Sequence, residues 1–303
     1  MTAVAARKGQ LHNMVARTSA ALWRRPWLRA ILTLSPPLAF FLLIYLASLI
    51  VMLITAFWTV NPFTNNLQHT LTLVNFQDLF QAPIPAIIGR TVLMAALVTV
   101  ADIILAVPFA YFMARVASPR TRHALFVAVL LPLWASYLAR VYAWIVILTK
   151  DGTLDWTTQH LGLGSPNIGY TNVAMWLVFT YIWLPFMIIP VYGAFERIPD
   201  SFIEASADLG AHNSRTLRSV ILPMVLPGIV AGSIFTFSLT LGDFITPELI
   251  GSGSNTNMIG NVIYDNIGLA NNLPFAAALA MVPIVIMTFY LLAARALGAF
   301  EAM

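Results

Sequence analysis

Residues Asp200–Pro227 read DSFIEASADLGAHNSRTLRSVILPMVLP and form the longest polar stretch between two hydrophobic runs. Ser201 followed by Glu204 predicts a capping box, in which each side chain accepts a hydrogen bond from the other residue's free backbone N–H. Gly210 suits the left-handed conformation that ends many helices. The stretch therefore predicts a short helix that begins at the capping box and ends at a glycine.

A second helix is predicted beyond this glycine. Asn213 or Ser214 is expected to begin it, and Pro223 is expected to mark a boundary before the next hydrophobic run. A connector between two membrane spans needs only a few polar residues. A helix–glycine–helix arrangement over residues 196–223 therefore predicts a docking surface outside the bilayer.

The composition of the whole chain indicates an integral membrane protein. Its 303 residues are 59% hydrophobic and only 9% charged, whereas soluble domains carry about 25% charged residues. The absence of cysteine excludes disulfides and thiolate metal sites. The net charge of +4 does not indicate nucleic-acid binding, because the basic residues lie at the ends of hydrophobic runs and form no interleaved patch.

Six hydrophobic stretches are long enough to span a membrane as helices, which requires about 20 apolar residues each. They predict an all-α integral membrane protein with one transmembrane domain over residues 31–303, preceded by a basic segment at residues 1–30. The predicted spans are Ile31–Phe57, Arg90–Met113, Ala124–Leu148, Val173–Phe195, Met224–Ile250 and Pro274–Leu297.

The distribution of lysine and arginine predicts the orientation of these spans. Basic residues gather in the N-terminal segment, in the connector between the second and third spans, and in the 196–223 segment. The connectors on the opposite side hold only Arg90 and Lys150, both at span edges. Because positive charge accumulates on the cytosolic side, both termini and the 196–223 segment are expected in the cytosol.

The connectors expected outside the membrane differ in character. Trp58–Gly89 is long enough to fold as a small external cap. Lys150–Tyr170 contains an Asp-Gly turn signal, followed by an amphipathic piece at Leu154–Leu161. Gly251–Pro274 is rich in Gly, Ser and Asn.

Short motifs exclude several kinds of enzyme. The chain has no Gly-x-x-x-x-Gly-Lys-Ser/Thr loop for nucleotide phosphates, no His-Glu-x-x-His metal motif and no Gly-x-Ser-x-Gly nucleophile turn. No catalytic residue and no metal ligand is therefore predicted. A Gly228-x-x-x-Gly232 motif is present in the fifth span and predicts close packing against another helix.

Charged residues inside the predicted spans are candidate functional residues, because charge in a bilayer is costly. They are Asp102, Arg140 and Asp243, with Glu248 near the end of the fifth span. In one interpretation Asp243, with Glu248 or Asp102, lines a passage for a cation. In the other, Arg140 forms a structural pair with Asp243 or extends toward the membrane surface.

Aromatic residues flank Arg140 along the third span. Trp134, Tyr137, Tyr142 and Trp144 would offer cation–π faces to an amine. The alternative is that these side chains belong to the aromatic belt at the membrane interface or pack against other helices.

The 196–223 segment resembles a known family motif. Glu204-Ala205-Ser206, then Gly210 and a closing Leu222-Pro223 resemble the EAA motif of the permease subunits of bacterial ABC importers. Ser206 replaces the motif's second alanine and Val220 replaces its isoleucine. The resemblance implies the type I ABC importer permease fold, with six spans and a cytosolic helix–Gly–helix coupling segment.

Within that family the chain looks most like the spermidine/putrescine permease subunits. This implies import of polyamines or similar small organic cations, although relatives for ferric iron, opines and phosphonates share pieces of the pattern. The stretches that carry the resemblance are Leu131–Trp134, Leu138–Trp144, Leu184–Met187, Asp243–Pro247 and Ile259–Ile263.

The resemblance also implies partners and a location. A second, different permease subunit would complete the solute path, two ATPase subunits would dock on the coupling segment, and an extracytoplasmic solute-binding protein would deliver the solute. The complex would lie in the bacterial cytoplasmic membrane. This chain would need no cofactor and would not be an enzyme, because the ATPase uses the ATP and Mg²⁺.

Two groups of site residues follow by position in the motif and in the spans. The expected ATPase-coupling residues are Glu204, Ala205, Ser206, Asp208, Gly210, Leu222 and Pro223. The expected substrate-path residues are Asp243, Glu248, Arg140, Tyr137, Trp134 and Asp102. Two rival hypotheses are an ion-coupled secondary transporter and a purely structural subunit. The first is disfavoured because the sequence shows no inverted repeat. The second leaves the EAA segment unexplained.

Overall fold

The computed structural model describes residues 26–61 and 63–296 and divides into two units, each described here by itself. The first unit ends at Thr55 and contains α2 (Pro26–Phe40), the π-helix η1 (Phe41–Leu46) and α3 (Ala47–Thr55). Ala30–Thr55 is long and apolar enough to cross a membrane, as predicted for the first span. Residues 1–25 of the predicted basic segment lie outside the described residues.

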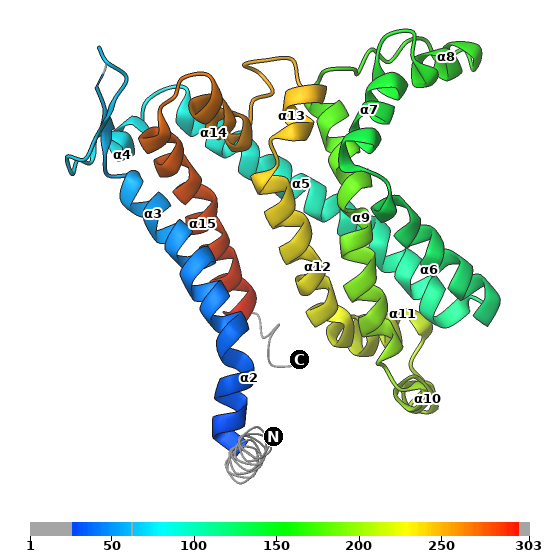
Figure 1. Cartoon of the computed structure of the whole chain (residues 1–303). Coiled ribbons are helices and arrows are strands. Elements are labelled where there is room, and N and C mark those ends of the chain that lie inside the picture. Colours follow the sequence, from blue (N-terminus) through cyan, green and yellow to red (C-terminus); the bar gives the residue numbers. More distant parts are fainter. Residues whose placement is uncertain (1–25, 62, 297–303) are drawn as a thin grey trace, which may run out of the picture. The chain divides into compact units, whose positions relative to one another are not determined.

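Three long helices form the centre of the second unit (Figure 1). They are α5 (Ile84–Tyr111), α9 (Asn172–Glu196) and α12 (Leu222–Gly242), and each packs against the other two. One apolar cluster joins α5 and α9 through residues such as Val98 and Val178. The other, near the end of α9, includes Met113, Val191 and Val225. The predicted second and fourth spans correspond to the helical runs Ile84–Val116 and Asn172–Glu196.

The predicted close approach at Gly228 and Gly232 is confirmed where α12 packs against α9. A Cβ atom on Gly228 would lie 2.5 Å from the Cβ of Ala194 and 2.7 Å from the carbonyl oxygen of Pro190. A Cβ atom on Gly232 would lie 2.6 Å from the sulfur of Met187. Only glycine allows the two backbones to come this close.

The second helix of the 196–223 segment is continuous with the fifth span, so the predicted boundary at Pro223 is wrong. α11 (Asn213–Thr216), the π-helix η3 (Leu217–Ile221) and α12 form one helical run, Asn213–Gly242. Proline lacks an N–H donor and its ring crowds the carbonyl four residues before it. The wider π-helical turn directly before α12 accommodates Pro223 without ending the helix.

The predicted third span, Ala124–Leu148, is not one continuous helix. α6 (Pro119–Trp134) and α7 (Tyr137–Leu148) are separated by Ala135, which has extended backbone, and Ser136. The run Tyr137–His160, which begins with α7, is bent by 95° relative to α6. Each half is apolar, so hydropathy alone gives no sign of the break.

The predicted fifth span, Met224–Ile250, is also interrupted. α12 ends at Gly242, Asp243 has extended backbone, and α13 (Ile245–Ile250) follows. Among the described residues, five helices are long and apolar enough to span a membrane, or six if the bent α6–α7 pair counts as one span. The last is α15 (Leu273–Ala296), close to the predicted sixth span.

Short elements fill the connectors predicted to lie outside the membrane. The first contains the antiparallel pair β1 (Thr59–Val60) and β2 (Leu67–Gln68), followed by α4 (Val74–Asp78). The second contains α8 (Thr153–His160), where an amphipathic piece was predicted. The third contains α14 (Ile259–Gly268).

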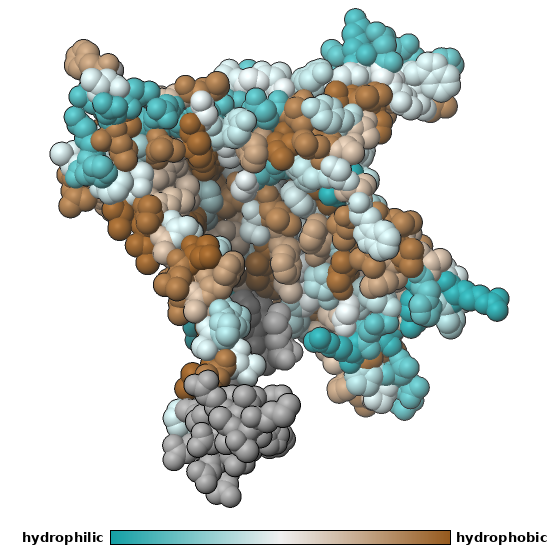
Figure 2. All heavy atoms as spheres, in the orientation of Figure 1, coloured by the Kyte–Doolittle hydropathy of each residue, from teal (hydrophilic) through white to brown (hydrophobic). Residues whose placement is uncertain are grey.

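The surface of the second unit is banded by hydropathy. Figure 2 shows hydrophobic side chains over the middle of the long helices and hydrophilic ones around α8 and around α10 (Asp200–Asp208), near opposite ends of α9. This banding is the pattern expected of helices that cross a bilayer and present polar connectors on both sides.

Candidate functional site

The first helix of the 196–223 segment forms, but without the predicted capping box. α10 begins at Asp200, its N-cap is Pro199, and no side chain caps it. Ser201 therefore lies inside the helix and does not precede it. The helix starts two residues earlier than the capping box predicted, because the prolyl N-cap holds extended backbone directly before Asp200.

The predicted glycine hinge is confirmed. Gly210 has a φ of +74°, the left-handed region that favours glycine. Its N–H donates to the carbonyl of Ala207 at 2.8 Å, and the N–H of Ala211 donates to that of Ser206 at 3.0 Å. These two bonds satisfy carbonyls that the end of α10 would otherwise leave free.

Ser206, which departs from the family motif, joins the two helices of the segment. Its hydroxyl is buried and lies 2.9 Å from the hydroxyl of Thr216 on α11. Sequence reasoning missed Thr216, and no spacing rule would have paired these residues across the glycine turn. The hydrogen bond fixes α10 against the start of the long helical run to α12.

The other expected coupling residues are accessible from outside the chain. Glu204, Ala205 and Asp208 are exposed on α10. Leu222 and Pro223 are exposed at the start of α12. Because α10 exposes both charged and apolar positions, it can contact another protein without first unfolding.

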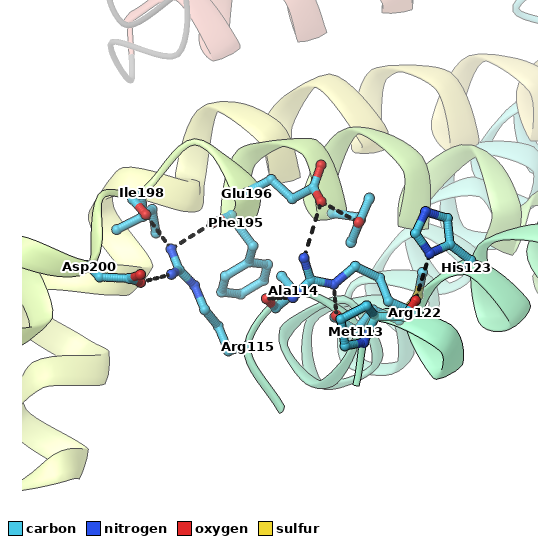
Figure 3. Close-up of polar contacts among 11 residues, drawn as sticks. Met113, Ala114, Arg115, Arg122, His123, Phe195, Glu196, Ile198 and Asp200 are labelled. Atoms are coloured by element: carbon cyan, nitrogen blue, oxygen red, sulfur yellow. Dashed lines mark hydrogen bonds and ion pairs between the residues drawn. The ribbon is translucent and has the colours of Figure 1, made fainter. Parts of the chain in front are cut away.

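Arg115 and Arg122 donate hydrogen bonds to backbone carbonyls near the ends of α9 and α5, respectively (Figure 3). Arg115 donates to Asp200 at 2.5 Å, to the carbonyl of Phe195 at 2.9 Å and to that of Ile198. Arg122 donates to the carbonyls of Met113 at 3.0 Å and Ala114 at 2.7 Å.

These contacts connect three elements. Arg115 lies in the π-helix η2 (Phe112–Val116), which continues α5, and Arg122 lies on α6. Arg122 also lies 3.9 Å from Glu196 at the last position of α9. In the sequence both arginines indicate only the orientation of the spans, and nothing in their spacing predicts these partners.

The two helix breaks meet at one group of hydrogen bonds, which we call the helix-break junction: Tyr137, Asp243 and Thr246. Oδ2 of Asp243 accepts from the hydroxyl of Tyr137, at the start of α7, and from that of Thr246 at 2.8 Å. Oδ1 accepts from the N–H groups of Ile245 at 2.8 Å and Thr246 at 3.4 Å. Donors of the chain itself thus occupy both carboxylate oxygens.

Arg140 is not paired with Asp243 in the part of the chain that the structure describes. Its guanidinium carbon lies 5.7 Å from the ring centroid of Tyr137. Its Nε and Nη1 atoms are buried and have no hydrogen-bond partner among the described residues. The unused hydrogen-bonding capacity beside the helix-break junction therefore consists of donors.

The remaining candidates lie in different surroundings. Glu248 accepts from Asn261 of α14 at 2.9 Å. Asp102 is fully buried on α5, and neither carboxylate oxygen has a partner among the described residues. Trp134 is 88% exposed at the end of α6.

The structure places Tyr137, Arg140 and Asp243 together. Within the described ranges no hydrogen bond connects these three residues to Glu248, Asp102 or Trp134. The same ranges contain no group of three or more His, Asp or Glu side chains arranged to hold a metal.

A match to a family model over most of the helical core shows the family to which the chain belongs. Residues 106–300 match the model of the family described as "Binding-protein-dependent transport system inner membrane component". The chain belongs to this family. As a member of this family, it is a permease component of an ABC importer with several membrane spans.

Curated relatives agree with the family assignment. The chain is 44% identical over 302 residues to the inner membrane ABC transporter permease protein YdcU of Escherichia coli K12, covering 95% of this chain and 96% of the relative. It is 32% identical over 213 residues to the spermidine/putrescine transport system permease protein PotB of Haemophilus influenzae, covering 70% and 74%. These relatives confirm the resemblance to polyamine permeases.

A solved structure shows that this binding-protein-dependent permease has the type I importer fold. The crystal structure of a bacterial ABC transporter that imports the acidic polysaccharide alginate matches with a TM-score of 0.73 at 20% identity. The match covers 92% of this chain and 98% of that chain. At this identity the likeness concerns the fold alone.

Proposed function

We propose that this permease forms, with a second and different permease subunit, the path by which a bacterial ABC importer takes up polyamines or similar small organic cations. The resemblance to spermidine/putrescine permeases supports the solute class. The basic connectors support an orientation with α10 and both termini in the cytosol.

The observation that carries the coupling role is the α10–Gly210–α11 arrangement. α10 is exposed, the left-handed glycine follows it, and α11 is continuous with the long helix that ends at Gly242. An ATPase that moves α10 would therefore move α12 as well. We assign ATP and Mg²⁺ use to two ATPase subunits, and solute delivery to an extracytoplasmic binding protein.

A second candidate is a solute with an anionic group, such as an opine or a phosphonate. Arg140 favours it, because the unused polar atoms beside the helix-break junction are guanidinium donors, while Asp243 is already occupied by donors of the chain. A guanidinium binds carboxylate or phosphonate oxygens well. Import of ferric iron is a further alternative that no described residue favours.

A thermal-shift panel on the binding protein that copurifies with this permease separates these candidates. Spermidine and putrescine are compared with opines, phosphonates, ferric iron and amino acids. Stabilisation by a polyamine supports the cation proposal, because a ligand that binds only the folded state raises the melting temperature. Stabilisation by an anion alone would overturn it and favour the second candidate.

The solute-path assignment has its own test in transport measurements. Under the cation proposal, Arg140→Gln is expected to leave spermidine uptake near wild type; under the second candidate it lowers uptake of the anionic solute. Asp243→Asn is expected to lower uptake in either case by disturbing the helix-break junction. Selective loss of spermidine uptake in Asp243→Asn would instead place Asp243 in a cation path.

A further inference from the structure

We propose that Arg115 is a positioning residue that transmits the movement of α10 into α5. The inference rests on the proposed coupling role of α10. It adds a second route to the membrane spans beside the covalent connection through α11 to α12.

The first step concerns what Arg115 touches. It lies at the end of α5 and contacts both elements that flank the 196–223 connection: the end of α9, through the carbonyls of Phe195 and Ile198, and the first residue of α10, Asp200. The last carbonyls of a helix carry partial negative charge. A planar guanidinium with five N–H donors can bind several such acceptors at once.

The second step concerns the difference between its acceptors. The side chain of Arg115 is 16% exposed, whereas that of Asp200 is 80% exposed. An ion pair with such an exposed carboxylate contributes little by itself, because water screens it. The carbonyl contacts are more sheltered, so Arg115 should depend on α9 for its position and thereby hold Asp200 at a fixed place.

The third step concerns what else lies between α10 and α5. A cavity of 640 Å³ lies between these elements, and its lining includes Tyr111 of α5, Ile203 of α10 and Arg115 itself. Ile203 packs at the edge of the apolar cluster that includes Met113 and Val191, and hydrophobic contacts of this kind are not directional. The directional contact from α10 to the end of α5 is therefore the one made by Arg115.

The experiment uses the complete complex of both permeases, ATPase and binding protein in proteoliposomes, with radiolabelled spermidine as the probe. The ratio of spermidine imported to ATP hydrolysed is measured for each variant at equal amounts of assembled complex. Arg115→Ala is expected to lower this ratio about five- to tenfold, which is the size of a typical coupling between two sites. ATP hydrolysis itself should continue.

Three further variants make the test specific. Arg115→Lys keeps the charge but not the planar fork and should show a smaller loss than Arg115→Ala. Asp200→Ala removes the contact of Arg115 with α10 and should show a loss of similar size to Arg115→Ala. Arg120→Ala is the matched control, because Arg120 is exposed in the same connector and makes no hydrogen bond or ion pair within the described residues. It should behave as wild type.

The outcomes separate the inference from the function on which it rests. A wild-type ratio in assembled Arg115→Ala complex, with only less complex formed, would show a purely structural role and overturn the inference. A wild-type complex that hydrolyses ATP without importing spermidine or any panel solute would overturn the proposed function first.

Discussion

The hydroxyl of Tyr137 donates to the carboxylate of Asp243, and this hydrogen bond joins the breaks in two interrupted helices. Tyr137 begins α7 directly after the bend that follows α6, and Asp243 lies between α12 and α13. The two residues are 106 positions apart. The same carboxylate accepts the first N–H groups of α13, so one side chain holds both breaks in place.

Tyr137→Phe tests this junction. Removing the hydroxyl leaves Oδ2 of the buried Asp243 with one donor fewer, and we expect a loss of about 1–3 kcal/mol in the free energy of unfolding. The melting temperature of the purified permease in detergent measures it. Tyr142→Phe, a change at an exposed tyrosine on the same helix, should have little effect; equal losses in both variants would contradict the role of the junction.

Gly210→Ala tests the left-handed turn after α10. Because Gly210 has a φ of +74°, a Cβ atom there costs about 1–2 kcal/mol in backbone strain, and we expect α10 to be misplaced and ATP hydrolysis to continue with reduced uptake. Gly89→Ala is the control, since a Cβ atom on that helical glycine meets nothing within 4 Å. Normal uptake by the Gly210 variant would show that the turn is not needed for coupling.

Gly228→Ala tests the packing of α12 against α9. The new methyl group would overlap Ala194 and the Pro190 carbonyl, and overpacking of this kind typically costs about 1–3 kcal/mol. We expect a lower melting temperature and less inserted protein on membranes. Gly193→Ala is the control, because a Cβ atom at Gly193 on α9 meets nothing within 4 Å and the change should be tolerated. A Gly228→Ala variant as stable as wild type would contradict the close contact between the backbones of α12 and α9.

Asp102→Leu tests whether the buried carboxyl group on α5 has a structural role. Its oxygens have no partner within the described residues, and replacing an unpartnered buried polar group by an apolar one is often neutral or stabilising. We therefore expect an unchanged or higher melting temperature, together with reduced uptake if Asp102 serves transport. A markedly lower melting temperature would indicate a partner supplied by another subunit or by water.

Asp155 predicts that the stability of the connector containing α8, outside the spans, depends on pH. Hydrogen bonds from Ser165 and from the N–H of Asp151 hold the pKa of Asp155 below its usual value. A lowered folded-state pKa means that the stabilisation is present above the unfolded pKa of about 3.9 and is lost as the pH falls through the folded pKa. Hydrogen exchange in α8 should therefore accelerate only at strongly acidic pH, and Asp155→Asn should remove that dependence.

Much of the fold could be predicted from hydropathy and from two motifs. Apolar runs longer than about 20 residues located the spans, Gly228 and Gly232 located a helix contact, and Gly210 located a turn, because each depends on local chemistry. The capping box at Ser201 and the boundary at Pro223 were wrong. In both places a neighbouring feature, an N-cap proline and a π-helical turn, satisfied the backbone in another way.

The sequence by itself determined the class of the molecule, its spans, its glycine turn and its family motif, since these depend on composition and on residues close together in the chain. Only the tertiary structure decided which partners the charged residues take. Arg115 binds Asp200, Tyr137 binds Asp243, and two buried nitrogens of Arg140 have no hydrogen-bond partner among the described residues. These pairings join residues 85 to 106 positions apart, and such distances are bridged by helix packing, which no local pattern encodes.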